Sequence, residues 1–103
     1  MSKWKLVDIE RAAPRTGKKW VAKFESINAS KKRMKRVPFG ALGAEDYTIH
    51  KDRQRRQRYL ERHQKDLLTR EPTRPGYLSY YLLWGPSTSL RKNLEMYRQK
   101  FSL

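Results

Sequence analysis

The segment from Pro75 to Leu90 constrains the fold more than any other part of this chain. Of the eight residues from Tyr77 to Trp84, only Ser79 is neither aliphatic nor aromatic. A helix that is apolar on all sides is normally buried, and eight residues are too few to cross a bilayer, which takes about 20. We therefore expect a short buried helix around which the rest of the chain folds.

Residues at both ends of this segment predict where the helix begins and ends. Pro75 suits a first helical turn, where its missing N–H forfeits no hydrogen bond. Gly85 suits the C-terminal cap, and Pro86 prevents the helix from continuing. Ser87 or Thr88 is then expected to cap a second helix.

A chain of this size and composition can build one small core. It has 103 residues, of which 37% are hydrophobic, below the usual level of about 45–50%. We therefore expect a single domain over residues 1–103. The absence of cysteine excludes disulfides, thiolate catalysis and cysteine-ligated metal sites. No apolar run follows the N-terminus, so the sequence predicts neither a signal peptide nor a membrane anchor.

Positive charge dominates the composition. The chain has 25 lysines and arginines against 10 acidic residues, which gives a net charge of +15 at pH 7. Self-repulsion at this density disfavours a free compact monomer, so we expect a polyanionic or acidic partner. Nucleic acid, an acidic protein surface and an anionic membrane surface all meet that expectation. We predict no small-molecule substrate.

Period-two patterns predict that the first 39 residues form a three-stranded antiparallel meander. In the middle strand Trp20, Ala22 and Phe24 fall on one face, with charged residues on the other. Pro38 has no N–H for the ladder, so the third strand ends there or lies at the sheet edge. The predicted strands cover residues 4–11, 19–25 and 33–39, with turns at 13–17 and 28–30.

A connection over residues 40–51 leads to three predicted helices within residues 52–103. Asp52 stands where an N-cap belongs, ahead of a helix over residues 53–69. The last helix, over about residues 88–101, has an apolar stripe formed by Leu90, Leu94, Tyr97 and Phe101. The predicted fold class is α+β, with a three-stranded antiparallel sheet followed by three helices packed on one face.

Two basic sets are the candidate binding residues. Residues 1–44 carry 12 cations and 3 anions, so we expect the N-terminal sheet and its second turn to be the main electrostatic surface. Residues 45–70 carry 8 cations and 5 anions, a balance that also suits a solvated helix face. Arginine dominates there, which favours bidentate contacts to carboxylate or phosphate. The predicted polyanion-binding residues are Lys31, Lys32, Arg33, Lys35, Arg36, Arg55, Arg58, Arg62 and Lys65.

No residue pattern predicts catalysis or metal binding. A zinc site would need His50 and His63 together with Asp46 and Asp52, at a spacing that matches no ligand signature. We expect these carboxylates to pair with nearby arginines and to cap the helix, His63 to pack beside Tyr59, and His50 to make a turn hydrogen bond. No nucleophile–base–orienter set is recognisable, so we predict a non-enzymatic protein without metal or cofactor.

Five pieces of sequence occur in a recognisable order, at residues 38–41, 43–52, 58–63, 78–85 and 89–101. Together they resemble a family of small basic proteins encoded by large double-stranded DNA viruses of algae and protists, from about Val37 to the C-terminus. That family has no established biochemical activity, so the resemblance supplies no catalytic residue. It implies a location in the virion, or otherwise inside the host cell where virus assembles.

These observations lead to two hypotheses of different classes. The first is a non-enzymatic structural protein, a minor capsid component that bridges larger capsid proteins through their acidic surfaces. The second is a sequence-nonspecific nucleic-acid-binding protein that packages or coats the viral genome. An accessory subunit of viral transcription machinery is a third possibility, which no residue pattern favours.

Overall fold

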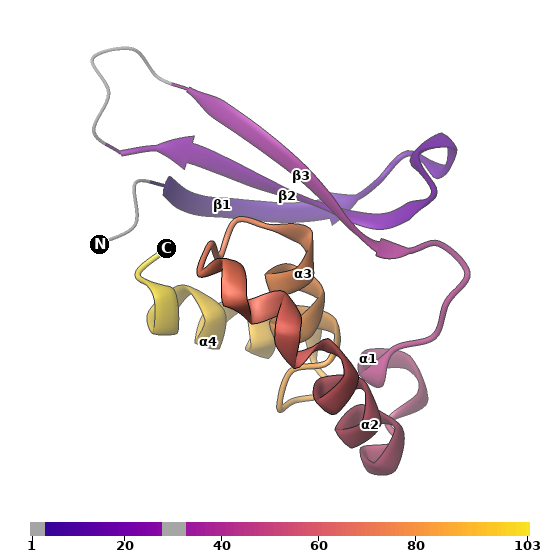
Figure 1. Cartoon of the computed structure of the whole chain (residues 1–103). Helices are drawn as coiled ribbons and strands as arrows, with labels where there is room; N and C mark the ends of the chain where they lie inside the picture. Colours follow the sequence, from indigo (N-terminus) through magenta and orange to yellow (C-terminus); the bar gives the residue numbers. More distant parts are fainter. Residues whose placement is uncertain (1–3, 28–32) are drawn as a thin grey trace.

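The computed structural model describes residues 4–27 and 33–103. It has the predicted α+β fold, with a three-stranded antiparallel sheet followed by helices that lie against one face of the sheet (Figure 1). The predicted second turn, at residues 28–30, lies outside the described residues.

The sheet has the strand order β1-β2-β3, with β2 in the middle. The strands are β1 (Trp4–Arg11), β2 (Lys18–Ser26) and β3 (Met34–Ala41). Pro38 lies on an edge strand, as predicted, but β3 continues to Ala41 because the ladder to β2 holds residues on both sides of the proline. Between Leu6 and Asp8 the register of β1 shifts by a bulge.

Alternate residues of the strands form the inner face that the helices cover. Leu6, Phe24 and Phe39 are fully buried, and the register places Leu6 opposite Phe24 and Phe39 opposite Trp20. The first turn is a short 3-10 helix, η1 (Pro14–Thr16), and Gly17 ends it in the left-handed region at a φ of 70°. Apolar alternation therefore fixes which face of the sheet is buried.

The predicted buried helix consists of two parts, α3 (Pro75–Leu78) and η3 (Ser79–Leu83), which we call the central segment. Pro75 begins it, as expected for a residue without an N–H. The second part is a π-helix, in which the Trp84 N–H donates to the Ser79 carbonyl at 3.1 Å. Four of its nine residues are buried, Tyr77, Leu78, Leu82 and Leu83, and Leu78 and Leu82 are fully so, whereas Tyr80 and Tyr81 are only partly buried.

Three short helical elements connect β3 to the central segment. They are α1 (Tyr47–His50), α2 (Arg53–His63) and the 3-10 helix η2 (Gln64–Thr69). The connection predicted over residues 40–51 therefore contains the helix α1. The helix predicted over residues 53–69 is an α-helix up to His63 and a 3-10 helix from Gln64 to Thr69. The Asp52 carboxylate accepts from the backbone N–H groups of Gln54 and Arg55, which confirms its role as N-cap.

The last helix, α4 (Leu90–Phe101), packs on the central segment through Leu94 and Tyr97. Its N-cap is Ser89, whose hydroxyl accepts from the Lys92 N–H at 3.3 Å, so the predicted caps Ser87 and Thr88 were wrong. The reason is tertiary, because the buried Asn93 amide bonds both the N–H and the carbonyl of Ser87 and holds that residue in the loop.

Candidate polyanion-binding surfaces

The solvent-facing side of the sheet is not a uniform cationic surface. Glu10 accepts from Arg36 at 2.9 Å and pairs with Lys23 at 3.1 Å, and the register sets Lys5 opposite Glu25. Hydrogen bonds from Lys23 and Arg36 lower the pKa of Glu10. Arg36, a predicted binding residue, therefore has an intramolecular partner on this face.

Lys35 also has a structural contact. Its ammonium donates to the Thr73 hydroxyl at 3.0 Å and lies 5.5 Å from the centre of the Trp4 ring. Thr73 is buried in the loop that precedes the central segment. The side chain of Lys35 therefore connects the sheet to the helical layer.

Arg33 is exposed and directly precedes β3. Its backbone pairs with Ser26, while no hydrogen bond or ion pair joins its guanidinium to the described residues. Lys31 and Lys32 precede it in the sequence and lie outside the described residues. We call these three residues the hairpin set.

The second predicted site lies on one side of α2 and continues into η2. Arg58, Arg62 and Lys65 are exposed and make no hydrogen bond or ion pair with residues 4–27 or 33–103. Arg55 makes one long contact, 3.6 Å to the exposed Glu45. Exposed ion pairs of this kind contribute only about 0–1 kcal/mol to the stability of the fold. We call Arg55, Arg58, Arg62 and Lys65 the helix set.

Aromatic stacking attaches the opposite side of α2 to the core. The Tyr59 ring stacks on Trp84 at 4.2 Å between centroids and on His63 at 4.0 Å, which confirms the predicted packing of His63. The His63 ring bonds Asp66 at 3.0 Å. Burial raises the pKa of Tyr59 to about 12. The helix set is thus carried by a helix whose other side is fixed.

Arg56 completes this attachment, although the sequence did not distinguish it from its neighbours. Its Nε donates to the carbonyls of Trp84 and Gly85 at 3.0 and 2.9 Å, and its guanidinium lies 5.6 Å from the Tyr47 ring. These carbonyls follow the π-helix. The feature of the sequence that could have indicated this role for Arg56 was its position three residues before Tyr59, which places both side chains on the same side of α2.

The acidic residues of the connection are structural. Asp46 caps α1 and forms a buried ion pair with Lys19 at 2.7 Å, so its cation is a lysine and not one of the expected arginines. His50 accepts from the Asp52 N–H at 2.9 Å, the predicted turn hydrogen bond. Among the described residues no group of three or more histidine, aspartate or glutamate side chains is placed to hold a metal ion.

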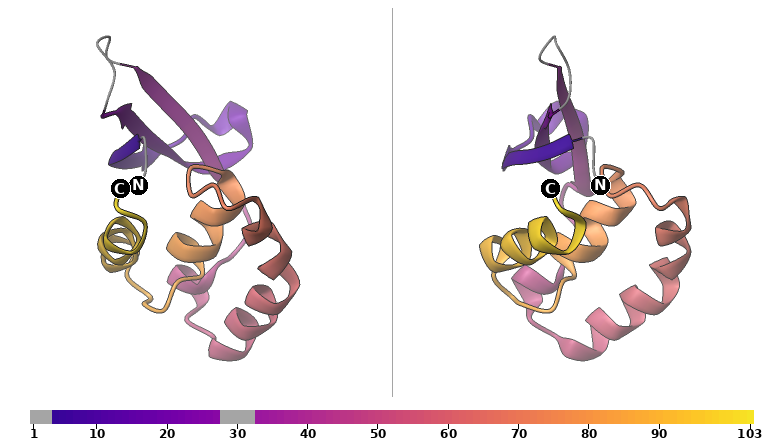
Figure 2. Two further views of the ribbon diagram at one scale, coloured as in Figure 1. Left: turned by 60° about the vertical axis from the view of Figure 1, so that its left-hand side comes forward. Right: turned by 90° about the vertical axis from the view of Figure 1, so that its left-hand side faces the viewer.

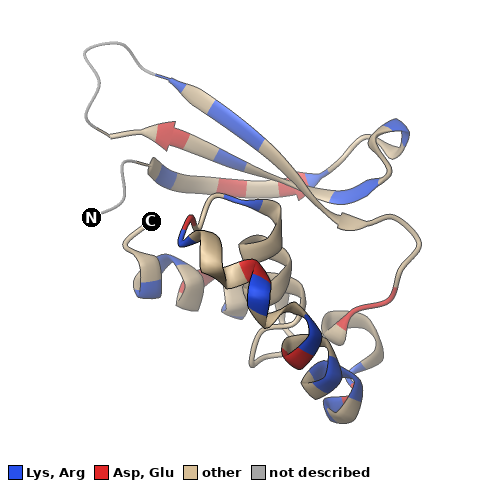
Figure 3. Ribbon diagram, in the orientation of Figure 1, with Lys and Arg blue, Asp and Glu red and all other residues tan. Residues whose placement is uncertain are grey.

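Arg33 and the helix set lie at opposite ends of the described part of the molecule. Figure 1 shows that β3 begins at the end of the sheet farthest from α2, and the longest dimension of the molecule is 46 Å. Figure 3 shows lysine and arginine along both elements. The structure therefore groups the helix set, leaves Arg33 apart from it, and gives Lys35 and Arg36 partners within the fold.

A family model described as a family of unknown function (DUF5754) matches residues 11–63, which is 53 of the 103 residues. The match spans β2, β3, α1 and α2, and ends before Lys65. No curated protein and no solved structure matches the chain. None of the helices in the described residues has the length and apolar character that a membrane span requires.

Proposed function

The chain belongs to the family of unknown function DUF5754, and we propose that it is a non-enzymatic structural protein of a large DNA virus, a minor capsid component that bridges larger capsid proteins. The viral setting rests on the sequence resemblance. The bridging role rests on one observation: exposed cations with little or no pairing among the described residues lie at two ends of an elongated molecule, Arg33 at one end and the helix set at the other.

Two separate charged ends suit a protein that joins two partners. At physiological ionic strength, charges are screened beyond about 8 Å, whereas the molecule is 46 Å long. Each end therefore attracts its own acidic surface independently of the other. Between them, on the outer face of the sheet, Glu10 pairs with both Lys23 and Arg36.

The interior fixes the geometry between the two ends. Tyr59, Trp84 and Arg56 attach α2 to the end of the central segment, and Lys35 attaches β3 to the loop before it. Leu78 and Leu82 of that segment are fully buried in the common core with the inner face of the sheet. A small protein held in this way sets both the distance and the angle between the surfaces it joins.

Sequence-nonspecific nucleic-acid binding is the second candidate, and α2 alone favours it. Four cations of the helix set share one exposed side, and three of them are arginines, which bind phosphate in bidentate fashion. On this alternative the hairpin set and the helix set both contact phosphates, and the protein stays with the genome.

The test is incorporation of variants into virions. One variant carries Lys31→Ser, Lys32→Ser and Arg33→Ser, and another carries Arg58→Ser, Arg62→Ser and Lys65→Ser. A control of equal charge loss carries Arg15→Ser, Lys18→Ser and Arg91→Ser, at exposed positions outside both sets. Because a bridge fails when either end is lost, each of the first two should abolish recovery in emptied shells, and the control should not.

Two results would contradict the bridging role. The wild-type protein would leave with the genome when the shells are emptied, or all three variants would lose incorporation equally. The first result would favour packaging. The second would show that net charge matters and its arrangement does not.

A further inference from the structure

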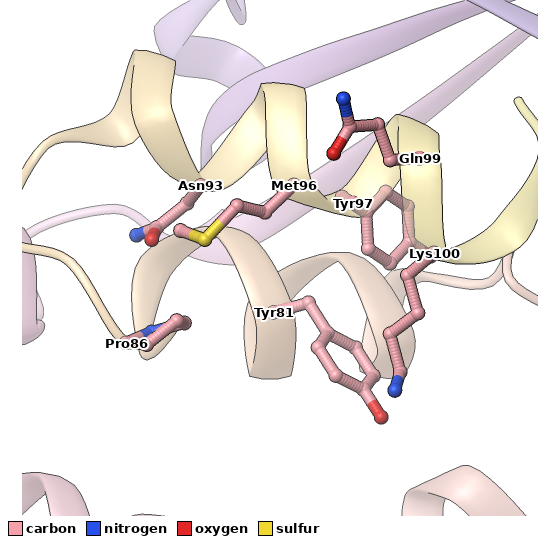
Figure 4. A pocket seen from close by; sticks show the side chains of 7 residues that line it. All are labelled: Tyr81, Pro86, Asn93, Met96, Tyr97, Gln99 and Lys100. Carbon is pink, nitrogen blue, oxygen red and sulfur yellow. The ribbon is translucent and has the colours of Figure 1, made fainter.

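A groove of about 550 Å³ lies between the central segment and α4 (Figure 4). Tyr81 and Pro86 line one wall, and Met96 and Lys100 line the other. The aromatic ring of Tyr97 lies at its base and is almost fully buried. In all views of the ribbon, α4 and α2 lie on opposite sides of the central segment (Figures 1 and 2). The groove is therefore separate from the helix set.

Two hydrogen-bond donors project side by side at the mouth of this groove. The Lys100 ammonium lies 5.9 Å from the centre of the Tyr81 ring, and both side chains extend in the same direction (Figure 4). Neither the ammonium nor the Tyr81 hydroxyl forms a hydrogen bond with the described part of the chain. Burial and the neighbouring Tyr80 and Tyr77 raise the pKa of Tyr81, so its hydroxyl remains a donor at neutral pH.

The inner part of the groove offers an apolar surface. Asn93 is 1% exposed, and its amide already donates to the carbonyls of Leu82 and Ser87 and accepts from the Ser87 N–H. The amide of Gln99 points away from the cavity (Figure 4). A nucleobase placed here would leave its polar edge unpaired, which is costly. An apolar side chain has no such requirement.

The wall that carries Tyr81 has an unusual backbone. Tyr81 lies in the π-helical part of the central segment, and short π-helical insertions occur frequently at functional sites. Lys100 is the one charged residue among those that line the groove, so the charge at its mouth is positive. Shape and charge together therefore select an apolar group attached to an acidic chain.

We propose that this groove docks an acidic segment of a partner protein. An apolar side chain of that segment enters between Tyr81 and Met96, and an adjacent carboxylate accepts hydrogen bonds from the Tyr81 hydroxyl and the Lys100 ammonium. Such hydrogen bonds to a charged group are stronger than neutral ones. This third surface goes beyond the two cationic ends and does not depend on them.

The test uses two fluorescein-labelled peptides of equal charge, Gly-Glu-Glu-Phe-Glu-Glu-Gly and the same peptide with serine in place of phenylalanine. Anisotropy at about 0.15 M salt should show that the phenylalanine peptide binds at least about tenfold more tightly, because only its aromatic side chain is removed from water in the groove. Lys100→Gln should weaken its binding about tenfold, and Tyr81→Phe several-fold, because each removes a hydrogen bond to a carboxylate.

Lys92→Gln is the matched control, because it removes the same charge from the same helix at an exposed position outside the groove. It should weaken binding less than twofold. Equal binding of the two peptides, or equal effects of Lys92→Gln and Lys100→Gln, would overturn the proposal in favour of general charge attraction. Tighter binding of a ten-nucleotide oligothymidine, lost in Lys100→Gln, would assign the groove to nucleic acid instead. Neither outcome alters the shell-incorporation test of the bridging role.

Discussion

Gly85 occupies a position that no side chain can share. A Cβ added there would lie 2.2 Å from the Tyr81 carbonyl oxygen and 2.7 Å from the Asn93 side chain. The sequence indicated Gly85 as the C-terminal cap of this helix, on the ground that glycine readily adopts a positive φ. The described positive-φ glycines are Gly17, Gly40 and Gly43. At Gly85 the reason is space, because the π-helix and α4 meet at its Cα.

We therefore expect Gly85→Ala to destabilise the protein by about 3 kcal/mol or more, since backbone and a buried amide would both have to move. Gly43→Ala is the matched control, because it has a φ of 84° and open space around its Cα. Gly43→Ala should lower the free energy of unfolding by only about 1–2 kcal/mol, because the left-handed backbone conformation is its one unfavourable feature. Thermal or urea unfolding measures both. Similar losses in the two variants would show that the contact between Gly85 and α4 is wrongly placed.

Nearby residues in the sequence predicted most secondary-structure elements, whereas contacts between residues far apart in the sequence could not be predicted. The Asp52 cap and the strands were predictable because their signals lie within a few residues of where they act. The four-residue helix α1 was missed, since a pattern so short has no periodicity. The partners of Lys35 and Arg36 lie 38 and 26 residues away, so no local pattern could show that these two cations are engaged.

The residues of α2 that contact the core are only partly buried, and we expect the position of this helix to depend on Arg56. Lysine at this position keeps the charge but cannot reproduce a planar guanidinium over Tyr47 that also bonds two carbonyls. Arg56→Lys should therefore increase hydrogen exchange of the α2 amides about tenfold and leave the sheet protected. Arg53→Lys, at an exposed position on the same helix, should leave exchange unchanged. Uniform loss of protection in Arg56→Lys would show that α2 does not open as a separate unit.

At the scale of the whole molecule, the arrangement of charge matters more than its total. Any protein with a net charge of +15 binds DNA at low salt. A cation that already has an acidic partner in the fold contributes less to DNA binding than an unpaired one, because its ion pair must be broken before it can contact a phosphate. Arg58 and Arg62 have no acidic partner among residues 4–27 and 33–103, whereas Lys23 and Arg36 share Glu10.

We therefore expect the double variants Arg58→Ser, Arg62→Ser and Lys23→Ser, Arg36→Ser to differ, although both remove two charges. Each phosphate contact contributes about 0.9 to the slope of log affinity against log salt concentration. The first variant should lower that slope by nearly 2 and the second by well under 1, as measured by titration of a 20-base-pair duplex. Wild-type binding should be weaker than about 10 μM at 0.15 M salt, because exposed charges are screened there. Micromolar or tighter binding at that salt, lost in the first variant, would instead make genome packaging the function that these cations serve.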